Sequence, residues 1–190
     1  MSDRSLEAGL EGYRRELARW GSHMNLVGST APEAIERHIE DALAASGSLP
    51  TGARAVDLGS GAGLPGVPLA ISRPDVRWVL VEVREARVHF LRNVARVLGL
   101  PIEVRRCRIE EAPEESFDVA VARALAPLER TLALSRPWIH DRGETWVWTR
   151  ERPSDQALPG WSSIPIDPSG SRGHILRVPA LAIPRGTSGA

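Results

Sequence analysis

The sequence predicts an α/β protein with a Rossmann-like, mostly parallel sheet, and three observations support this. From residue 54 onward, short apolar segments alternate with amphipathic segments of helical spacing, which is the pattern of βαβ units. The first apolar segment runs into four glycines within eight residues, as expected for a ligand-binding loop between a strand and a helix. The length of 190 residues, with 42% hydrophobic and 25% charged residues, suits one globular domain with a small appendage.

Two helices are predicted before the sheet. The first covers residues 4–20, because five apolar residues recur at helical spacing: Leu6, Leu10, Tyr13, Leu17 and Trp20. This stripe predicts that the helix docks on the main domain, and Gly21 ends it. The second helix begins at Thr30, which forms a capping box with Glu33, and continues to about Ala45.

A linker rich in glycine, serine and proline at residues 47–52 separates these helices from the rest of the chain. We therefore expect a helical extension at 1–50 and a ligand-binding domain at 51–183. The tail at 184–190 is expected to be disordered.

The remaining elements alternate between strands and helices. Five strands are predicted at 54–58, 77–82, 102–106, 117–122 and 143–149. Helices are predicted between them at 65–72, 85–98 and 131–138. Two further apolar segments, 162–166 and 174–178, flank an Asp-Pro-Ser-Gly turn and predict an antiparallel pair at the sheet edge.

The formal net charge is zero, but the charge is unevenly placed and all 24 basic residues are arginine. Residues 84–108 carry seven arginines and two glutamates, whereas residues 1–50 carry five arginines and eight acidic residues. The arginine-rich segment is either a phosphate-binding surface or a solvated helix face.

Several classes of protein are disfavoured by what the sequence lacks. The single cysteine, Cys107, excludes a disulfide framework and a cysteine-built metal site, and the five histidines have no metal-ligand spacing. We therefore expect no metal. No long apolar segment and no charged-then-apolar leader occurs, so we expect a cytoplasmic protein without a membrane span.

The glycine-rich stretch is compatible with two classes of cofactor. Gly61-x-Gly63-x-x-Gly66 fits the dinucleotide fingerprint. Asp57-x-Gly59-x-Gly61-x-Gly63 is instead typical of class I methyltransferases that bind S-adenosylmethionine. The acidic residue favours the second class, because the ammonium and sulfonium groups of that cofactor are cationic, whereas a pyrophosphate would be repelled. A glycine-rich turn without any ligand is the remaining alternative.

Other polar residues are predicted to meet this loop at the carboxyl ends of the strands, where open α/β sheets bind ligands. Glu82 ends the second strand, at the place of an acid that binds a ribose hydroxyl in either cofactor class. Arg108 to Glu110 follow the third strand, and Arg123 follows the fourth. Each has a simpler interpretation: Glu82 as a surface acid, Glu110 as part of a solvated loop, and Arg123 in a structural ion pair with Asp57 or Glu110.

At this point the sequence resembles a known family, the bacterial small-subunit rRNA guanine-N7 methyltransferases (RsmG or GidB). The motifs that carry the resemblance are Trp20-x4-Asn25-Leu26, Arg37-His38-Ile39-x-Asp41-Ala42-Leu43, the loop from Asp57 to Ala70 with its Gly-Leu-Pro-Gly, Phe90-Leu91, Arg108-Ile109-Glu110-Glu111, and Phe117-Asp118-x4-Arg123-Ala124. They occur in the family's order over roughly residues 13–150. The resemblance implies a seven-stranded class I methyltransferase sheet that transfers a methyl group to guanine N7 in 16S rRNA.

The resemblance also implies roles for single residues. Gly59 and Leu64 would lie at the methionine side of S-adenosylmethionine, Ile109 and Glu110 at its adenine, and Arg123 beside the methyl-transfer site. Together with the loop and strand-end residues, the expected cofactor site is Asp57, Gly59, Gly61, Gly63, Leu64, Glu82, Ile109, Glu110 and Arg123. The expected partner is 16S rRNA or the 30S subunit, bound by a monomer.

The sequence departs from the family at two lysines. Ala86 and Thr149 occupy their places, with Arg87 and Arg150 adjacent. We expect RNA to contact His38, Arg87, Arg92, Arg96 and Arg150. The alternatives are a diverged methyltransferase that acts on a small molecule or another nucleic acid, an NAD-dependent oxidoreductase, and a non-catalytic RNA-binding relative.

Overall fold

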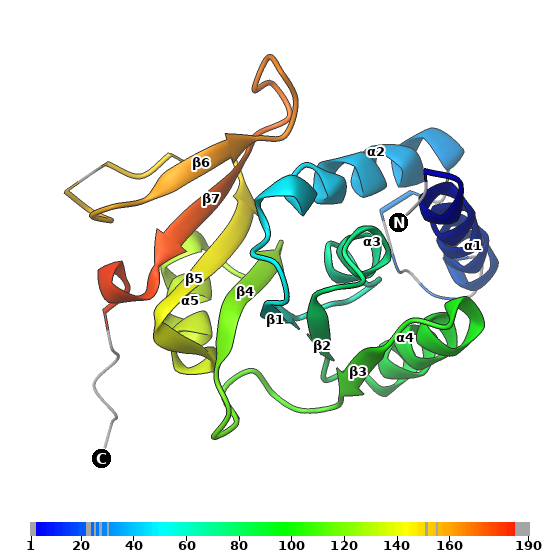
Figure 1. Ribbon diagram of the computed structural model, residues 1–190, viewed down its shortest axis with the longest axis horizontal. Helices are drawn as coiled ribbons and strands as arrows, with labels where there is room; N and C mark the ends of the chain where they lie inside the picture. Colours follow the sequence, from blue (N-terminus) through cyan, green and yellow to red (C-terminus); the bar gives the residue numbers. More distant parts are fainter. Residues whose placement is uncertain are drawn as a thin grey trace.

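The computed structural model describes residues 3–21, 24, 26, 28–29, 31–150, 152–154 and 156–184. At its centre is a seven-stranded sheet of order β3-β2-β1-β4-β5-β7-β6 (Figure 1). The strands are β1 (Arg54–Leu58), β2 (Arg77–Val81), β3 (Ile102–Arg105), β4 (Phe117–Arg123), β5 (Ile139–Thr149), β6 (Ser162–Pro165) and β7 (His174–Pro179). Strands β1 to β5 are parallel, and β7 is antiparallel to both of its neighbours. The predicted fold class and the antiparallel edge pair are confirmed.

The helices are α1 (Asp3–Gly21), α2 (Pro32–Leu43), α3 (Gly66–Ser72), α4 (Glu85–Leu98) and α5 (Leu128–Ser135), with short 3-10 turns at Ser46–Ser48, Arg136–Trp138 and Ala180–Ala182. Alternate residues of each strand serve the two faces of the sheet, since a strand has a side-chain period of two. Ala55 and Leu80 belong to a core with α1 to α4, whereas Val56 and Val79 belong to a second core with α5. Burial on both faces explains why the central strands are almost entirely apolar.

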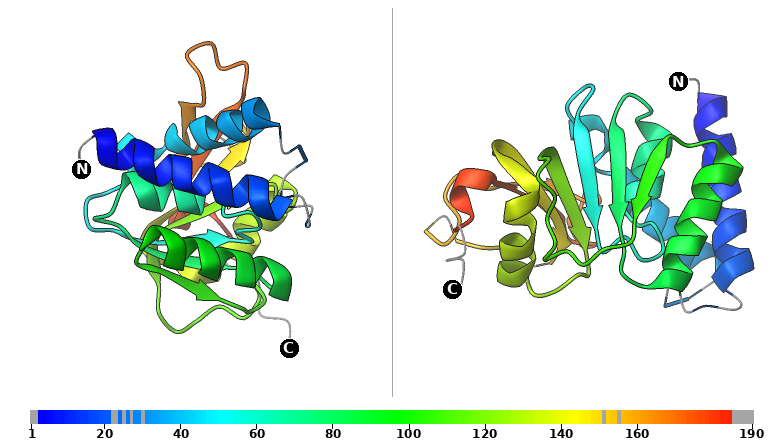
Figure 2. Two further views of the ribbon diagram at one scale, coloured as in Figure 1. Left: turned by 90° about the vertical axis from the view of Figure 1, so that its right-hand side faces the viewer. Right: turned by 90° about the horizontal axis from the view of Figure 1, so that it is seen from below.

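Helix α1 packs directly on the main domain, as its apolar stripe predicts. Leu10, Tyr13 and Leu17 are buried in the same core as α3 and α4. Both views of Figure 2 show α1 alongside α4, where the rings of Trp20 and Phe90 meet edge to face at 5.8 Å. The division of the chain at residue 50 stays a prediction.

Some predicted features fall outside the described residues. These are the capping residue Thr30, Asn25 of the N-terminal motif, and the tail from residue 185 onward. Within the described part, α2 begins at Pro32 with Ala31 as its N-cap, and no side chain caps it.

Strand β5 begins four residues earlier than predicted, because Gly143 forms a bulge inside the strand. Phe117 pairs with Ile139, but Val119 pairs with Glu144, so the register shifts between them. A β-carbon at Gly143 would lie 3.0 Å from the carbonyl oxygens of β4. Gly143 therefore marks a close approach of the backbones of β4 and β5, and not the start of the strand.

Helix α5 also begins earlier than predicted, at Leu128 and not at Thr131, and it ends at Ser135. The last predicted turn is a separate 3-10 turn that contains Pro137. Proline cannot donate a backbone hydrogen bond, which is consistent with the end of the α-helix at this point. Among the described helices, none has the length and apolar character needed to cross a membrane.

Candidate active site

The glycine loop joins β1 to α3 at the carboxyl edge of the sheet. Gly59, Gly61 and Gly63 have φ values of +73°, +57° and +88°, a region that residues with a β-carbon rarely adopt. The amides of Gly59 and Ser60 both donate to the carbonyl of Val81 at 2.9 Å, which ties the loop to the end of β2. The loop is therefore held against the neighbouring strand, as a ligand cradle requires.

Two cavities open beside this loop. The first, of about 290 Å³, is lined by Gly59, Val81, Glu82, Val83, Arg84, Arg87, Cys107, Arg108, Ile109, Glu110, Ala124 and Leu125. The second, of about 230 Å³, is lined by Leu26, His38, Gly59, Ser60, Gly61, Ala62, Leu64, Arg87, Arg123 and Ala124. Gly59, Arg87 and Ala124 line both, so the two cavities adjoin. After the roles that the sequence predicts for their lining residues, we call the first the nucleoside cavity and the second the transfer cavity. A larger hollow of about 670 Å³ between α1 and α2 shares no lining residue with them.

Glu82 lies in the wall of the nucleoside cavity, buried at the end of β2. Its Oε2 accepts a hydrogen bond from the amide of Gly61 at 3.0 Å, and its Oε1 accepts from the amides of Val83 and Arg84 at 2.9 Å. Arg87 Nη1 approaches Oε2 to 3.8 Å. The carboxylate thus fixes the glycine loop in addition to facing the cavity, a structural function that the sequence did not predict.

Asp57, which the sequence predicts to contact the ligand, is buried beneath the loop and does not line either cavity. Its side chain is 1% exposed, and Oδ2 accepts the amide of Gly66 at the start of α3 at 3.0 Å. Burial raises the pKa of Asp57 to about 7, so the carboxyl is partly protonated at neutral pH and is not a fixed negative charge. Its Oδ1 has no hydrogen-bond partner among the described residues.

The three loop glycines meet different surroundings, which separates their roles. A β-carbon at Gly63 would lie 2.6 Å from Val67 and 3.1 Å from Leu91, so packing requires a glycine at this position. Its contact with the cofactor stays a prediction. At Gly59 the nearest atom would be Leu125 Cδ1 at 2.8 Å. At Gly61 the nearest side-chain atom would be Arg87 Nη1 at 3.5 Å, so this position faces the open cavity.

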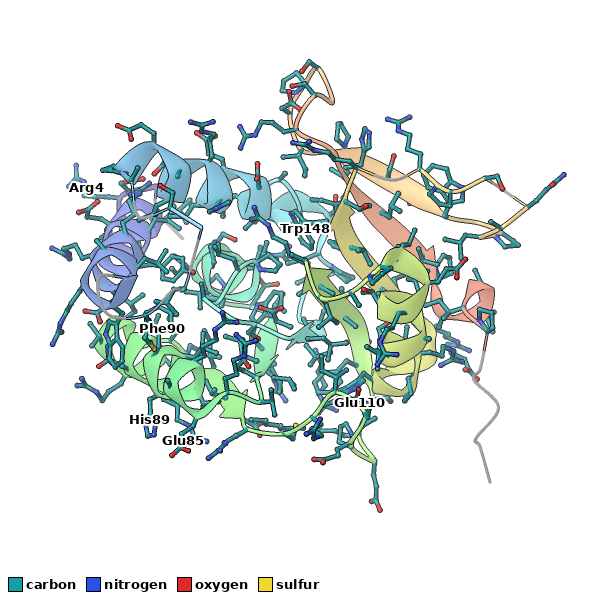
Figure 3. The ribbon with its side chains drawn as sticks, turned by 180° about the vertical axis from the view of Figure 1, so that it is seen from behind. Arg4, Glu85, His89, Phe90, Glu110 and Trp148 are labelled. Atoms are coloured by element: carbon teal, nitrogen blue, oxygen red, sulfur yellow. The ribbon has the colours of Figure 1, made fainter. Side chains whose placement is uncertain are left out.

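The residues expected near an adenine lie in the wall of the nucleoside cavity. Ile109 is held by its carbonyl, which accepts a 2.7 Å hydrogen bond from the indole of Trp138. Glu110, labelled in Figure 3, is more exposed, at 55% of its side chain. Its carboxylate lies 3.9 Å from Arg130. Leu64, expected at the methionine side, lines the transfer cavity.

Arg123 ends β4 and lines the transfer cavity, where α2 holds its guanidinium. Nη1 donates to the carbonyl of His38 at 3.2 Å, and Nη2 donates to His38 Nδ1 at 2.7 Å. Nη2 also pairs with Asp41 Oδ2 at 3.3 Å. An ion pair therefore exists, but its partner is Asp41 of α2 and not Asp57 or Glu110 as the alternative interpretation proposed.

The residues expected to contact RNA come from α2, α4 and the segment just after β5, and their contact with RNA stays a prediction. Arg87 and His38 lie in the cavity walls. Arg92 and Arg96 are exposed along α4, and Arg92 Nη2 donates to the carbonyl of Val104 at 3.3 Å. Arg150 is exposed just after β5.

The roles of two residues in the site were not predicted from the sequence. Tyr13 of α1 is fully buried and donates from its hydroxyl to the carbonyl of Ala62 at 2.7 Å, so the N-terminal helix holds the glycine loop. Burial raises its pKa well above the usual value, and the nearby Asp57 adds to this. Ala124 has a φ of +52° and lines both cavities; such strain in a non-glycine residue is common at functional sites. Only the apolar stripe of α1 pointed to Tyr13, and it indicated burial alone.

No group of three or more histidine, cysteine, aspartate or glutamate side chains within the described ranges is arranged to hold a metal ion. The strand order and the glycine loop after β1 are those of the Rossmann-like fold of class I methyltransferases. A solved relative in fold is the Thermus thermophilus 16S rRNA N2 G1207 methyltransferase RsmC in complex with AdoMet and guanosine. It superimposes with a TM-score of 0.57 at 16% identity, over 80% of this chain and 44% of that one.

Within this class, the chain belongs to the rRNA small subunit methyltransferase G family (GidB), whose model matches residues 6–159. It is 44% identical over 143 residues to ribosomal RNA small subunit methyltransferase G of Frankia alni, covering 72% of this chain and 55% of the relative. It is 36% identical to the protein of that name from a Methylobacterium strain, covering 95% of this chain and 92% of the relative. The chain thus spans little more than half of the first relative and nearly all of the second. The resemblance stated from the motifs is confirmed.

Proposed function

We propose that this chain, acting as a cytoplasmic monomer, transfers a methyl group from S-adenosylmethionine to N7 of a guanine in 16S rRNA. The observation that carries the proposal is the continuity of the two cavities across Gly59, Arg87 and Ala124. One cavity suits a nucleoside, and the other presents Arg123 and His38 at the place where a second substrate would meet it. Membership in the methyltransferase G family supports the choice of rRNA.

The residues of the nucleoside cavity fit S-adenosylmethionine. The carboxylate of Glu82 would accept hydrogen bonds from ribose hydroxyls, and Ile109 and Leu125 would contact the flat base. On the side of the transfer cavity, the absence of a side chain at Gly61 would leave the backbone open to the amino-acid part of the cofactor. When bound, the cofactor supplies a methyl group on a positively charged sulfur.

A dinucleotide fits the same loop less well. In dinucleotide-binding folds the pyrophosphate accepts hydrogen bonds from amides at the start of the helix after the loop. Here the amide of Gly66 at the start of α3 already donates to Asp57 Oδ2. That amide is therefore not available to a pyrophosphate, so the structure favours S-adenosylmethionine over NAD.

The transfer cavity has the chemistry that methylation of guanine N7 needs. That nitrogen carries a lone pair and no proton, so no general base is required and orientation of the reacting groups supplies the catalysis. Burial, and then the positive charge of Arg123, lowers the pKa of His38, which keeps its ring neutral at physiological pH. A neutral ring can accept the hydrogen bond from Arg123 and so hold that guanidinium in the cavity wall.

Methyl transfer to RNA tests the proposed function. The protein would be incubated with radiolabelled S-adenosylmethionine and, separately, undermethylated 30S subunits, naked 16S rRNA or a panel of small metabolites. We expect label in 16S rRNA, at guanine N7, from one or both of the RNA substrates. Label in a metabolite but in neither RNA would instead favour a diverged methyltransferase.

We also propose that the exposed face of α4 contributes to RNA affinity. Changing Arg92 and Arg96 together to glutamate should weaken RNA binding and reduce the slope of log affinity against log salt by about 1 to 2, because fewer counterions are released. Cofactor affinity should stay unchanged. Binding would be followed by filter retention between 50 and roughly 200 mM salt.

The matched control for this pair is on α1. Arg15 and Arg19 are also exposed and one helical turn apart, and their change to glutamate alters the net charge of the protein by the same amount. Equal losses of RNA affinity in the two double variants would show that net charge, and not the α4 face, is responsible.

A further inference from the structure

Arg172 lies more than 130 positions in the sequence from its partners in α2, yet it makes several contacts with the last turns of that helix. It belongs to the connection between β6 and β7, which stands beside the carboxyl end of α2 in Figure 1. Its Nη1 donates to Glu40 Oε2 at 2.8 Å and its Nη2 to the carbonyl of Arg37 at 3.0 Å. Its Nε donates to Asp41 Oδ1 at 2.9 Å, and Nη2 also contacts that oxygen. A cation at the carboxyl end of a helix is electrostatically favourable.

Asp41 is shared between two arginines, one on each carboxylate oxygen. Oδ1 accepts from Arg172, and Oδ2 accepts from Arg123. The Asp41 carbonyl also accepts a 2.7 Å hydrogen bond from the indole of Trp148, so the backbone of this residue is anchored independently. What Arg172 adds is the orientation of the carboxylate: without it, both oxygens would be free to turn toward Arg123.

Rotation of the Asp41 carboxylate would change the position of Arg123 at the transfer cavity. At present its guanidinium divides its hydrogen bonds between His38 and Asp41. A carboxylate that is no longer held on its far side can form a two-point pair with a guanidinium, which is the stronger geometry. Arg123 would then be drawn toward Asp41 and away from His38.

We infer that Arg172 is a positioning residue, which sets the guanidinium of Arg123 at the transfer cavity through Asp41. The inference rests on the proposed function only for its effect on methyl transfer. It assigns a role to the β6–β7 connection, which lies beyond residues 6–159 that the family model matches.

The first test is a double-mutant cycle on single-turnover methylation of 16S rRNA at saturating cofactor. Arg172→Ala should slow transfer about tenfold, less than the hundredfold that full misplacement of a reacting group can cause. In an Arg123→Ala background the same change should have no further effect, because Arg172 acts through Arg123. Arg172→Lys keeps the positive charge but not the planar, forked set of donors, so its transfer rate should lie between those of the parent and of Arg172→Ala.

A second readout does not depend on activity. The pKa of His38 would be measured by NMR titration in the parent and in Arg172→Ala, with the signal assigned by comparison with His38→Gln. Arg123 contributes to lowering the pKa of His38, so its withdrawal should move that pKa upward. Arg37 and Asp41 are the other charged groups that act on His38, and neither is mutated. Asp41 raises the pKa of His38, so the turned carboxylate does not oppose the expected upward shift.

The matched control is Glu40→Gln, which removes an exposed partner of Arg172 but leaves the bond to Asp41. It should leave both the rate and the His38 titration as in the parent. Additive losses in the cycle, or an unchanged His38 pKa in a folded Arg172→Ala protein, would overturn the inference. If the parent itself does not methylate RNA, the proposed function fails, and the titration still decides the role of Arg172.

Discussion

Replacing Gly61 with valine is expected to abolish binding of S-adenosylhomocysteine while leaving a folded protein. Gly61 has a φ of +57°, and a side chain there would extend into the open cavity beside Arg87. Its amide also donates to Glu82, so the valine would disturb the cradle and occupy the ligand's space at once. We expect the dissociation constant to rise at least about 100-fold, or about 2.7 kcal/mol, by calorimetry.

The control for backbone strain is Gly99→Val. Gly99 has a φ of +62° at the end of α4, and apart from its chain neighbours a β-carbon there would meet no atom within 4 Å. Both substitutions therefore impose similar strain, of roughly 1 to 2 kcal/mol, but only one enters the cavity. Equal affinity of the two variants for S-adenosylhomocysteine would place the ligand elsewhere. Tighter binding of NAD than of S-adenosylhomocysteine by the parent protein would overturn the cofactor assignment.

Much of the fold could be predicted because its signals are local. The apolar strands, the Gly-rich loop after the first of them and the amphipathic stripe of α1 each depend on neighbouring residues. The convergence of Glu82 and Arg123 also followed, since parallel strands end at one edge of a sheet. Gly143 was misinterpreted because a glycine inside a strand and a glycine before a strand produce the same local pattern.

The contacts that hold the site could not be predicted, because periodicity says which face of a helix is buried but not what it meets. Tyr13 reaches a loop carbonyl 49 positions away. Arg123 binds His38 and Asp41, more than 80 positions away, after α2 has crossed to the carboxyl edge of the sheet. Asp57 was predicted to bind a cation, yet the packing of α3 over β1 buries it and raises its pKa.

The contacts of Arg123 with α2 allow both a structural and a functional interpretation of this residue. Substitution of Arg123 separates the two interpretations. Its side chain is 19% exposed, with its guanidinium in the wall of the transfer cavity. Without it, Asp41 would keep its pairing with Arg172, so no buried charge would be left alone. We therefore expect Arg123→Ala to fold, with a loss of about 1 to 3 kcal/mol from its charged hydrogen bonds.

Methyl transfer should suffer far more than stability does. We expect Arg123→Ala and Arg123→Lys both to lose about 100-fold in the single-turnover rate at saturating cofactor, because in-line transfer tolerates little misalignment. Lysine does not rescue the rate, since one ammonium cannot reproduce the planar contact with the carbonyl of His38, its ring nitrogen and Asp41.

The control is Arg77→Ala, which removes an exposed arginine at the opposite end of the sheet and should change neither the melting temperature nor the rate. Melting temperature and rate would be measured on the same samples. An Arg123→Ala protein that is strongly destabilised, but as active as the parent when folded at low temperature, would assign Arg123 to the structure alone. A protein that melts near the parent temperature and has lost methyl transfer assigns it to the reaction.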